Sequence, residues 1–369
     1  MRDFKRSKRL SSVFLLFLFF SFVQNSFADT PMKVGIVGLS HSHVHWILNP
    51  ESHKDIEVVG IVEPKLDMAN RYMKHYGYSK DIHFTNMEDM IKAVKPEAVT
   101  AFGSIFEHLE VVETCAPHGI HVMVEKPLAV NMEHASKMKA LAEKHNIHLL
   151  TNYETTWYPT NHKTFDMVKE GAIGDLRKVV VHDGHKGPIE IGINKEFAEW
   201  LTDPVLNGGG AITDFGCYGA NLIVWLTNGQ KPQSVTAVTQ TIKPEIYPNV
   251  DDEATIILKY PKMQGIIQAS WNWPVSRKDM EVYGKTGYII SENKSKIRYR
   301  LNEKATEKTE TLADRRVPFD NPFDLFAAVV KNKVELSPYD LSSLENNVLV
   351  VEILDKAKKS AKEERTIKF

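Results

Sequence analysis

Gly119-Ile-His-Val-Met-Val-Glu-Lys-Pro-Leu128 is a short apolar, β-branched run that ends in a carboxylate, an ammonium group and a proline. Pro127 fixes its own φ angle and pushes Lys126 towards an extended conformation. A strand that ends in this way directs a charged side chain out of the carboxyl edge of a sheet, where open α/β sheets bind ligands. A strand end with a solvated ion pair is the alternative, because surface ion pairs are common and weak.

The composition is that of an ordinary soluble globular protein, and the length indicates two domains. The chain has 369 residues, of which 43% are hydrophobic and 25% are charged. Its formal net charge of -1 gives no indication of binding to nucleic acid or to an anionic membrane. Cys115 and Cys217 are expected as two free, buried thiols, with one disulfide as the alternative.

Residues 1–28 predict a secretory signal peptide. Five basic residues precede the apolar run from Ser12 to Val23, and Ser26-Phe27-Ala28 offers small residues to a signal peptidase. The apolar run is too short to span a bilayer comfortably, so we expect export, most simply to the periplasm, with cleavage after Ala28 and no stable membrane anchor. An uncleaved N-terminal anchor is the alternative, and the sequence leaves the Sec and twin-arginine routes open.

Strands and helices alternate through the first half of the mature chain. Strands are expected at Lys33 to Val37, Glu57 to Val62, Ala98 to Phe102, His121 to Val124 and His148 to Tyr153. Helices of about ten residues separate them, which predicts an α/β fold with a parallel, doubly wound sheet over residues 29–150.

The turn after the first strand carries an incomplete form of the glycine motif of dinucleotide-binding folds. It reads Gly38-x-Ser40-x-x-His43, so that only the first glycine is present. Serine is small and its hydroxyl can donate to phosphate, whereas His43 predicts a helix that sits further from the strand. A turn that binds no nucleotide is the alternative for this motif taken alone.

Glu63, at the end of the second predicted strand, strengthens the nucleotide interpretation. A carboxylate at this place accepts hydrogen bonds from the ribose hydroxyls and repels a 2′-phosphate, which favours NAD over NADP. Lys65 is close enough to soften that preference.

His41, His43 and His45 do not predict a metal site. Alternate residues of a helix point in different directions, and no carboxylate or cysteine is interleaved. Hydrogen bonds to phosphate or substrate near the turn are expected instead.

A glycine-rich segment, Gly208-Gly-Gly-Ala-Ile-Thr-Asp214, opens a helix in the second half of the chain. Asp214, Tyr218, Asn221 and Trp225 are spaced so that they share one face of that helix. This polar stripe suits a helix whose N-terminal half lines a pocket. Alternating runs between residues 234 and 302 predict an antiparallel sheet, and an amphipathic helix over residues 341–359 is expected to pack back on the body.

Three motifs together give the chain a resemblance to the glucose-fructose oxidoreductase / inositol dehydrogenase / MocA (Gfo/Idh/MocA) family. They are Glu125-Lys-Pro127, Trp200-x-x-Asp-Pro204 and Gly208-Gly-Gly-x-x-x-Asp-x-Gly-x-Tyr218, and the resemblance covers about residues 32–365. It implies a Rossmann domain that binds NAD(P) at residues 29–150. It also implies a substrate-binding α+β domain at residues 151–369, built on an open, mostly antiparallel sheet that is often used for oligomer contacts.

Members of this family usually oxidise or reduce a ring carbon of a sugar or cyclitol. The resemblance therefore implies an NAD(P)-dependent oxidoreductase acting on CH–OH groups, with NADP the less favoured cofactor. A small-molecule sugar or glycoside is the expected partner, nucleic acid is not, and a homo-oligomer is expected through the C-terminal sheet.

The resemblance places Lys126 at the nicotinamide and substrate, and Asp214 at the reacting hydroxyl. Tyr218 occupies the place usually held by histidine, which changes the base. We hypothesise that Tyr218 is the acid/base, that Lys126 polarises the substrate oxygen, and that Asp214 orients the sugar. We also expect the Lys126 ammonium to lower the pKa of the Tyr218 phenol towards the working pH.

The other predicted site residues fall into two groups. The cofactor group is Gly38, Leu39, Ser40, His41, Ser42, His43, Glu63, His108, Glu125 and Lys126. The substrate group is His185, Lys186, Trp200 and Asn221, with His182 as a further candidate.

Three functions remain open at this stage. The first is an exported NAD-dependent sugar oxidoreductase. The second is a redox-neutral glycoside hydrolase or lyase that uses tightly bound NAD for transient oxidation and elimination. The third is a non-catalytic binding or sensory protein, which the set of Lys126, Asp214 and Tyr218 disfavours. The sequence does not name the sugar or the direction of hydride transfer.

Overall fold

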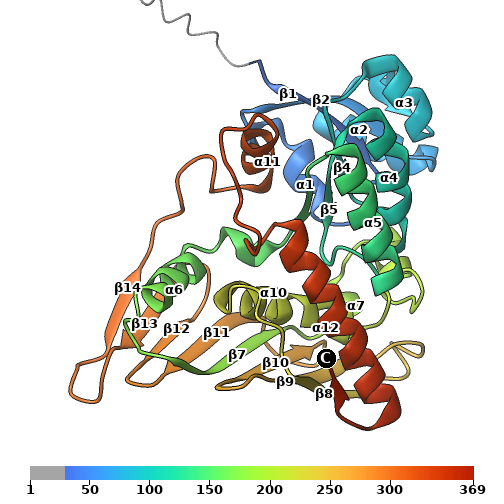
Figure 1. Ribbon diagram of the computed structural model, residues 1–369. Coiled ribbons are helices and arrows are strands. Elements are labelled where there is room, and N and C mark those ends of the chain that lie inside the picture. Colours follow the sequence, from blue (N-terminus) through green and yellow to red (C-terminus); the bar gives the residue numbers. More distant parts are fainter. Residues whose placement is uncertain (1–29) are drawn as a thin grey trace, which may run out of the picture. The chain divides into compact units, whose positions relative to one another are not determined.

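A computed structural model describes residues 30–369 of the chain (Figure 1). The predicted signal peptide, residues 1–28, lies outside the described residues, so export and localisation stay predictions. Within residues 30–369, no helix combines the length and the apolar character needed to cross a membrane.

A six-stranded parallel sheet forms the N-terminal part, in the order β3-β2-β1-β4-β5-β6. Its strands are β1 (Met32–Val37), β2 (Ile56–Val62), β3 (His83–Phe84), β4 (Ala98–Ala101), β5 (His121–Glu125) and β6 (Leu149–Asn152). Its helices are α1 (Val44–Leu48), α2 (Leu66–Tyr76), α3 (Met87–Val94), α4 (His108–Cys115) and α5 (Met132–His145). The strand order reverses between β1 and β4, and open α/β sheets bind ligands at such a switch point.

The predicted strands of this sheet are confirmed because they are continuous apolar runs. All four residues of β4 and the last four of β5 are buried, as expected for parallel strands covered on both faces. Strand β3 has two residues, too few to show a period, and the sequence did not predict it. Strand β6 ends at Asn152, so the sheet continues two residues beyond the expected domain boundary at 150.

A nine-stranded sheet forms the C-terminal part, in the order β14-β13-β12-β11-β7-β10-β9-β8-β15. Its strands are β7 (Leu176–Gly184), β8 (Ser234–Gln240), β9 (Glu253–Lys259), β10 (Gln264–Ser270), β11 (Arg277–Gly284), β12 (Tyr288–Ser291), β13 (Lys296–Arg300), β14 (Lys308–Thr311) and β15 (Ile367–Lys368). Only β7 and β10 pair in parallel, so the mostly antiparallel sheet is confirmed.

Helices of the second half lie mainly on one face of this sheet (Figure 1). They are α6 (Pro159–Lys169), α7 (Pro188–Ile191), α8 (Lys195–Leu201), α9 (Ala211–Asp214), α10 (Gly216–Leu226), α11 (Pro322–Val330) and α12 (Leu344–Glu363). On the other face, Val238 and Ile257 are exposed to 62% and 40%. Thr236, Thr255 and Gln268 lie on the same face, which is therefore mixed in character, and the homo-oligomer stays a prediction.

Helices α11 and α12 tie the two sheets together. Helix α12 packs back on the body, as predicted, with Leu349 and Ile353 in the C-terminal core and Val351 in the N-terminal core. Helix α11 buries Phe323 and Phe326 in the core around β1. The N-terminal sheet is therefore completed by a segment that lies far beyond residue 150.

The glycine-rich segment lets α9 and α10 approach the C-terminal sheet closely. A Cβ atom on Gly210 would lie 1.8 Å from the carbonyl oxygen of Asp251, and one on Gly219 would lie 2.5 Å from Ile267 Cγ2. The helix expected from Asp214 onwards is interrupted at Phe215, so Asp214 ends α9. Asp214 and Tyr218 therefore belong to two successive helices, and both side chains lie beside Lys126.

Asp251 fixes the start of this segment, because its carboxylate accepts hydrogen bonds from the backbone N–H groups of Gly210 (2.9 Å) and Ile212 (2.7 Å). Replacing a carboxylate that caps a helix start removes both bonds, so we predict that Asp251→Ala lowers the free energy of unfolding by about 1–2 kcal/mol. Chemical denaturation measures the change. Asp314→Ala, which removes an exposed carboxylate, is the control and should alter stability by less than about 0.5 kcal/mol.

Candidate functional site

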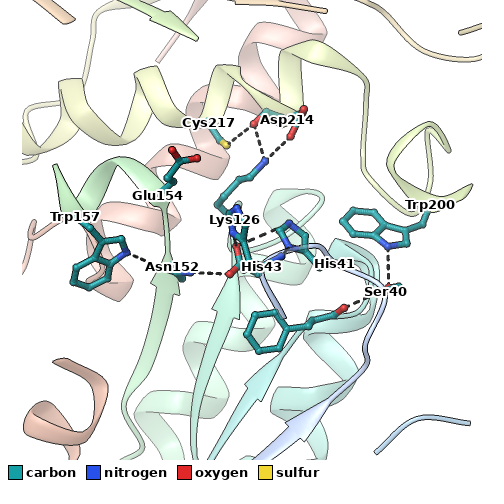
Figure 2. A network of polar contacts seen from close by, with 12 residues as sticks. Ser40, His41, His43, Lys126, Asn152, Glu154, Trp157, Trp200, Asp214 and Cys217 are labelled. Carbon is teal, nitrogen blue, oxygen red and sulfur yellow. Dashed lines mark hydrogen bonds and ion pairs between the residues drawn. The ribbon is translucent and has the colours of Figure 1, made fainter. Parts of the chain in front are cut away.

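The centre of the site is a buried ion pair between Lys126 and Asp214 (Figure 2). Lys126 directly follows β5, and its Nζ donates to the Asp214 carboxylate and also to the Asp214 carbonyl oxygen (3.1 Å). Trp271 Nε1 donates to the other carboxylate oxygen at 2.9 Å. The carboxylate is thus held from two sides, and the strand end of one sheet meets the helical segment that covers the other.

Burial and attraction oppose each other in this pair. Burial would lower the pKa of Lys126, but the Asp214 carboxylate outweighs it and the pKa lies above its ordinary value. Burial would likewise raise the pKa of Asp214, and Lys126 reverses that shift. Both groups are therefore charged near neutral pH, each because of the other.

The Tyr218 ring lies beside two ammonium groups. Its centroid is 5.1 Å from Lys126 Nζ and 4.8 Å from Lys278 Nζ. The expectation that Lys126 lowers the pKa of this phenol was wrong. Burial, followed by the carboxylates of Glu154 and Asp183, raises the pKa of Tyr218 well above its ordinary value. The phenol is therefore protonated at neutral pH, and it can donate a hydrogen bond or a proton.

Glu125 is anchored beside Lys126 by a chain of hydrogen bonds. Asn152 Nδ2 donates to one carboxylate oxygen (2.7 Å), and Trp157 Nε1 holds Asn152 from behind (3.0 Å). His43 Nδ1 lies 3.0 Å from the other oxygen. Burial alone would raise the pKa of Glu125, but His43 and His41 lower it to about 2.

His41, His43 and Glu125 lie close enough together to hold a metal ion. The argument that alternate histidines diverge along a helix was wrong here, because both histidines precede α1. His41 Nδ1 accepts the backbone N–H of His43 (3.0 Å), so a neutral His41 carries its proton on Nε2, which faces Glu125. That arrangement is a hydrogen-bonded cluster, in which His41 Nε2 has no lone pair for a metal.

The nucleotide turn leads from β1 to α1. The residues around it have the features that a bound dinucleotide requires. Gly38 has a φ of +78°, and a Cβ there would lie 2.7 Å from the backbone nitrogen of Gly103. A cavity of about 420 Å³ opens beside it, lined by Gly38, Glu63 and His108 among others. His108 is fully buried and its Nε2 has no hydrogen-bond partner among the described residues. These features fit a bound nucleotide.

Glu63, which follows β2, and Ser40, in the turn, make hydrogen bonds within the protein that the sequence did not predict. Glu63 accepts hydrogen bonds from the backbone N–H groups of Leu39 (3.1 Å) and Lys65 (2.9 Å), so its carboxylate also braces the turn. The Ser40 hydroxyl donates to the carbonyl oxygen of Phe102 (3.3 Å). A hydrogen bond from Ser40 to phosphate therefore requires exchange of that bond. Ser42 completes the turn before His43.

Residues 188–207, which we call the strap, extend from the C-terminal domain over the nucleotide cavity. Trp200 Nε1 donates to Ser40 Oγ at 3.0 Å, and Arg71 pairs with Glu196 at 2.7 Å. The strap residues Glu196, Glu199 and Trp200 line the cavity. The structure thus places Trp200, predicted as a substrate residue, at the cofactor turn (Figure 2).

The other predicted substrate residues lie in different places. His185 follows β7, and its ring lies 4.9 Å from that of Phe215 beside Asp214. Lys186 has an exposed side chain. Asn221 is buried and donates to the carbonyl oxygen of Leu341 (2.8 Å) at the start of the α12 region, where it serves packing. His182 points to the opposite side of the sheet from the neighbouring Asp183.

Sequence reasoning missed three charged residues near Tyr218. Lys278, on β11, pairs with Glu154, which follows β6. Asp183, on β7, is the cross-strand partner of Lys278. No motif surrounds these residues, and the pair of Lys278 and Glu154 is separated by 124 positions in the chain. The alternation of β7, which buries Val179, Val181 and Asp183 on one face, was the available signal.

Comparison with known sequence families shows to which family the chain belongs. The profile of the oxidoreductase family with an NAD-binding Rossmann fold matches residues 32–153, and the GFO/IDH/MocA C-terminal domain matches residues 162–290. The chain belongs to the GFO/IDH/MocA family of oxidoreductases. The predicted family and the predicted fold class are confirmed.

Curated relatives in this family include trans-1,2-dihydrobenzene-1,2-diol dehydrogenases. That of Xenopus tropicalis is 26% identical over 223 residues, which cover 58% of this chain and 61% of the relative. That of Bos taurus is 27% identical over 232 residues, which cover 62% and 65%. The chain therefore spans less than two thirds of the length of these relatives.

Solved structures with the same fold cover nearly the whole chain. An inositol dehydrogenase homolog from Azotobacter vinelandii, complexed with NAD⁺, has a TM-score of 0.80 at 16% identity and covers 92% of this chain and 98% of its own. Aldose-aldose oxidoreductase from Caulobacter crescentus, complexed with glycerol, has a TM-score of 0.77 at 20% identity and covers 92% and 100%. At these identities the likeness shows the fold.

The low pKa of Glu125 predicts an acid-dependent contribution to stability. Because the pKa falls from 4.5 to about 2 on folding, the ionised carboxylate stabilises the protein above pH 4.5, and this contribution is lost as the pH falls towards 2. We predict that Glu125→Gln is less stable than wild type at pH 7 and that the difference shrinks across this acidic window. Thermal unfolding across pH measures it. A difference that stays constant down to pH 2 would contradict the prediction.

Proposed function

We propose that this protein is an NAD-dependent oxidoreductase that transfers a hydride to or from a ring carbon of a sugar, cyclitol or glycoside. The observation that carries the proposal is the buried contact of Lys126 with Asp214 beside the Tyr218 phenol, next to the nucleotide turn. Family membership supports the reaction class. The buried Glu63 supports NAD over NADP, because a carboxylate there repels a 2′-phosphate.

Gly38, Glu63, His108 and the strap would hold the dinucleotide, which supplies the hydride acceptor or donor when bound. Lys126 carries a permanent positive charge and would polarise the oxygen of the reacting carbon. Asp214 keeps that ammonium in place and can accept a hydrogen bond from a neighbouring hydroxyl. Tyr218 would donate its proton to the carbonyl oxygen in the reduction direction and, after losing it, accept the alcohol proton in oxidation.

The catalytic roles predict large losses for two single substitutions. Lys126→Met and Tyr218→Phe should each lower kcat by about 10²–10⁴-fold, because each removes a group that acts on the reacting oxygen. Initial rates with NAD and a panel of sugars and cyclitols measure the loss, and NAD binding is followed by tryptophan fluorescence. Lys137→Met, which changes an exposed lysine of α5, is the matched control.

The raised pKa of Tyr218 determines the direction in which the rate of oxidation changes with pH. Oxidation requires the phenolate, so its rate should rise with pH through the alkaline range in the wild type, and Tyr218→Phe should lack this rise. Near-wild-type rates in both variants at all pH values would contradict the roles given to Lys126 and Tyr218.

A redox-neutral glycoside hydrolase or lyase is the second candidate, and the strap favours it. In such a reaction a hydride would pass from one ring carbon to bound NAD and return to that carbon at the end. In between, the acidified hydrogen on the neighbouring carbon is lost as a proton, the glycosidic group leaves as its alcohol and, in a hydrolase, water adds to the double bond. This cycle needs a cofactor that stays bound, and the strap is hydrogen-bonded to the turn at Ser40 through Asn194 and Trp200. Product formed without net NADH would select this candidate over the first.

Retention of the cofactor by the strap is tested by Trp200→Phe, which keeps an aromatic ring but removes the hydrogen bond to Ser40. We predict that NAD dissociates up to about tenfold faster from this variant, since a single hydrogen bond contributes about 0.5–1.5 kcal/mol. Stopped-flow fluorescence with a displacing nucleotide measures the rate. Trp225→Phe, where the indole stacks on Phe165 in the C-terminal domain, makes the same change elsewhere and should leave the rate unaltered.

A further inference from the structure

A second cavity lies on the C-terminal side of the site. Its volume is about 710 Å³, within the size range of ligand pockets, and none of its lining residues borders the nucleotide cavity. Its lining side chains include those of Glu154, His185, Arg277, Lys278 and Arg298. A cavity of this size beside the reaction centre offers room for more than the ring that reacts.

Lys278 and His185 connect this cavity to the reaction centre. Lys278 Nζ lies 4.8 Å from the centroid of the Tyr218 ring. Lys126 Nζ lies 5.1 Å from the same centroid. His185 lines the cavity and contacts the ring of Phe215, the residue after Asp214. A ligand with its reacting ring at Lys126 can therefore extend past Tyr218 into the cavity.

The positive charges that line the cavity are already matched by carboxylates. Arg277 makes two hydrogen bonds to Asp279 (2.7 and 2.8 Å), and Lys278 is bonded to Glu154. Arg298 pairs with Glu292 at 2.8 Å and with Glu307 at 3.0 Å. Burial lowers the pKa of His185, so its imidazole is neutral at pH 7.

The pairing of the charged side chains in the cavity determines which class of ligand it favours. An anionic group entering the cavity would meet four lining carboxylates, those of Glu154, Asp279, Glu281 and Glu292, while the three lining cations are already paired. Paired ions still present free lone pairs and N–H groups, which suit hydroxyl groups. The cavity therefore favours an uncharged ligand that is rich in hydroxyls over a uronate or a sugar phosphate.

Asp183 adds an unsatisfied polar group behind the cavity wall. It is 1% exposed, and neither of its carboxylate oxygens has a hydrogen-bond partner among residues 30–369. Its cross-strand neighbour Lys278 bonds to Glu154 instead, and the next two residues of β7 and its loop, Gly184 and His185, line the cavity. Asp183 is not part of the cavity lining, so it acts on a ligand through Lys278, whose ammonium group it helps to keep charged.

We propose that this cavity binds an uncharged, polyhydroxylated part of the substrate, such as the second sugar residue of a glycoside, and that Glu154 and Lys278 bind its hydroxyls. The inference rests on the proposed function, and it narrows the substrate to one larger than a monosaccharide or a simple diol. The reacting ring then lies at Lys126 and Tyr218, and the remainder occupies the cavity.

The direct test is calorimetric titration of the mature, NAD-loaded protein with matched ligands. The probes are glucose, the neutral disaccharides maltose and cellobiose, cellobiouronic acid, glucose 6-phosphate and cyclohexane-1,2-diol. At least one neutral disaccharide should bind about tenfold or more tightly than glucose, and both anionic probes should bind more weakly than it does. Equal binding of glucose and the disaccharides, preference for an anionic probe, or preference for the apolar diol would overturn the proposal.

Two variants test the roles of individual residues in the selectivity of the cavity. Glu154→Gln removes the carboxylate that is bonded to Lys278, so cellobiouronic acid should gain about tenfold in affinity relative to cellobiose. Asp183→Asn removes the second carboxylate beside Lys278, so it should shift the selectivity in the same direction while leaving the affinity for NAD unchanged. Glu133→Gln, at an exposed ion pair of α5, is the control. Unchanged selectivity in both folded variants would overturn the role of these residues, and the wild-type panel decides the ligand class if either variant fails to fold.

The outcomes also separate this inference from the proposed function. Disaccharide binding without hydride transfer to any probe would contradict the proposed function and leave the cavity assignment standing. Oxidation of glucose as efficient as that of every disaccharide would support the function and overturn the cavity assignment.

Discussion

The ion pair between Lys126 and Asp214 is the contact on which the site depends. It joins the end of β5 to the end of α9, across 88 positions of sequence and between the two sheets. Removing one member of a buried pair leaves the other charge uncompensated, which costs about 3–5 kcal/mol. The pair therefore fixes the alignment of the N-terminal and C-terminal parts and, with it, the position of the Tyr218 phenol.

The two sides of this pair have different physical characters. The nucleotide side combines a glycine turn, a buried carboxylate and an indole from the strap, which together enclose a small cavity. The substrate side is a larger cavity whose cations are each matched by a carboxylate. Under the proposed function, the first set of contacts would hold the cofactor and the second set would determine the substrate.

The sequence predicted those features that local pattern controls. The apolar runs of β4 and β5, the glycines that allow close packing at Gly210, and the position of Lys126 at a strand end all follow from neighbouring residues. The family resemblance placed Lys126 and Asp214 separately at the reacting substrate, and the structure adds the ion pair between them.

The features that the sequence did not predict depend on long-range strand pairing and on burial. The association of Lys278 with Glu154 and the isolation of Asp183 arise from strand pairing that no local motif encodes. The pKa of Tyr218 was predicted from one favourable neighbour, whereas burial and two nearby carboxylates dominate it. Asn221 looked like a pocket residue by its spacing, yet α12 covers that side of α10.

A crystal structure of the protein with bound NAD is the measurement that tests the central claim most directly. The account predicts that the nicotinamide ring lies within about 4 Å of both the Lys126 side chain and the Tyr218 side chain, with the adenosine beside Glu63. A nicotinamide ring bound away from Lys126 and Tyr218, with the Lys126–Asp214 pair intact and remote from it, would contradict the account.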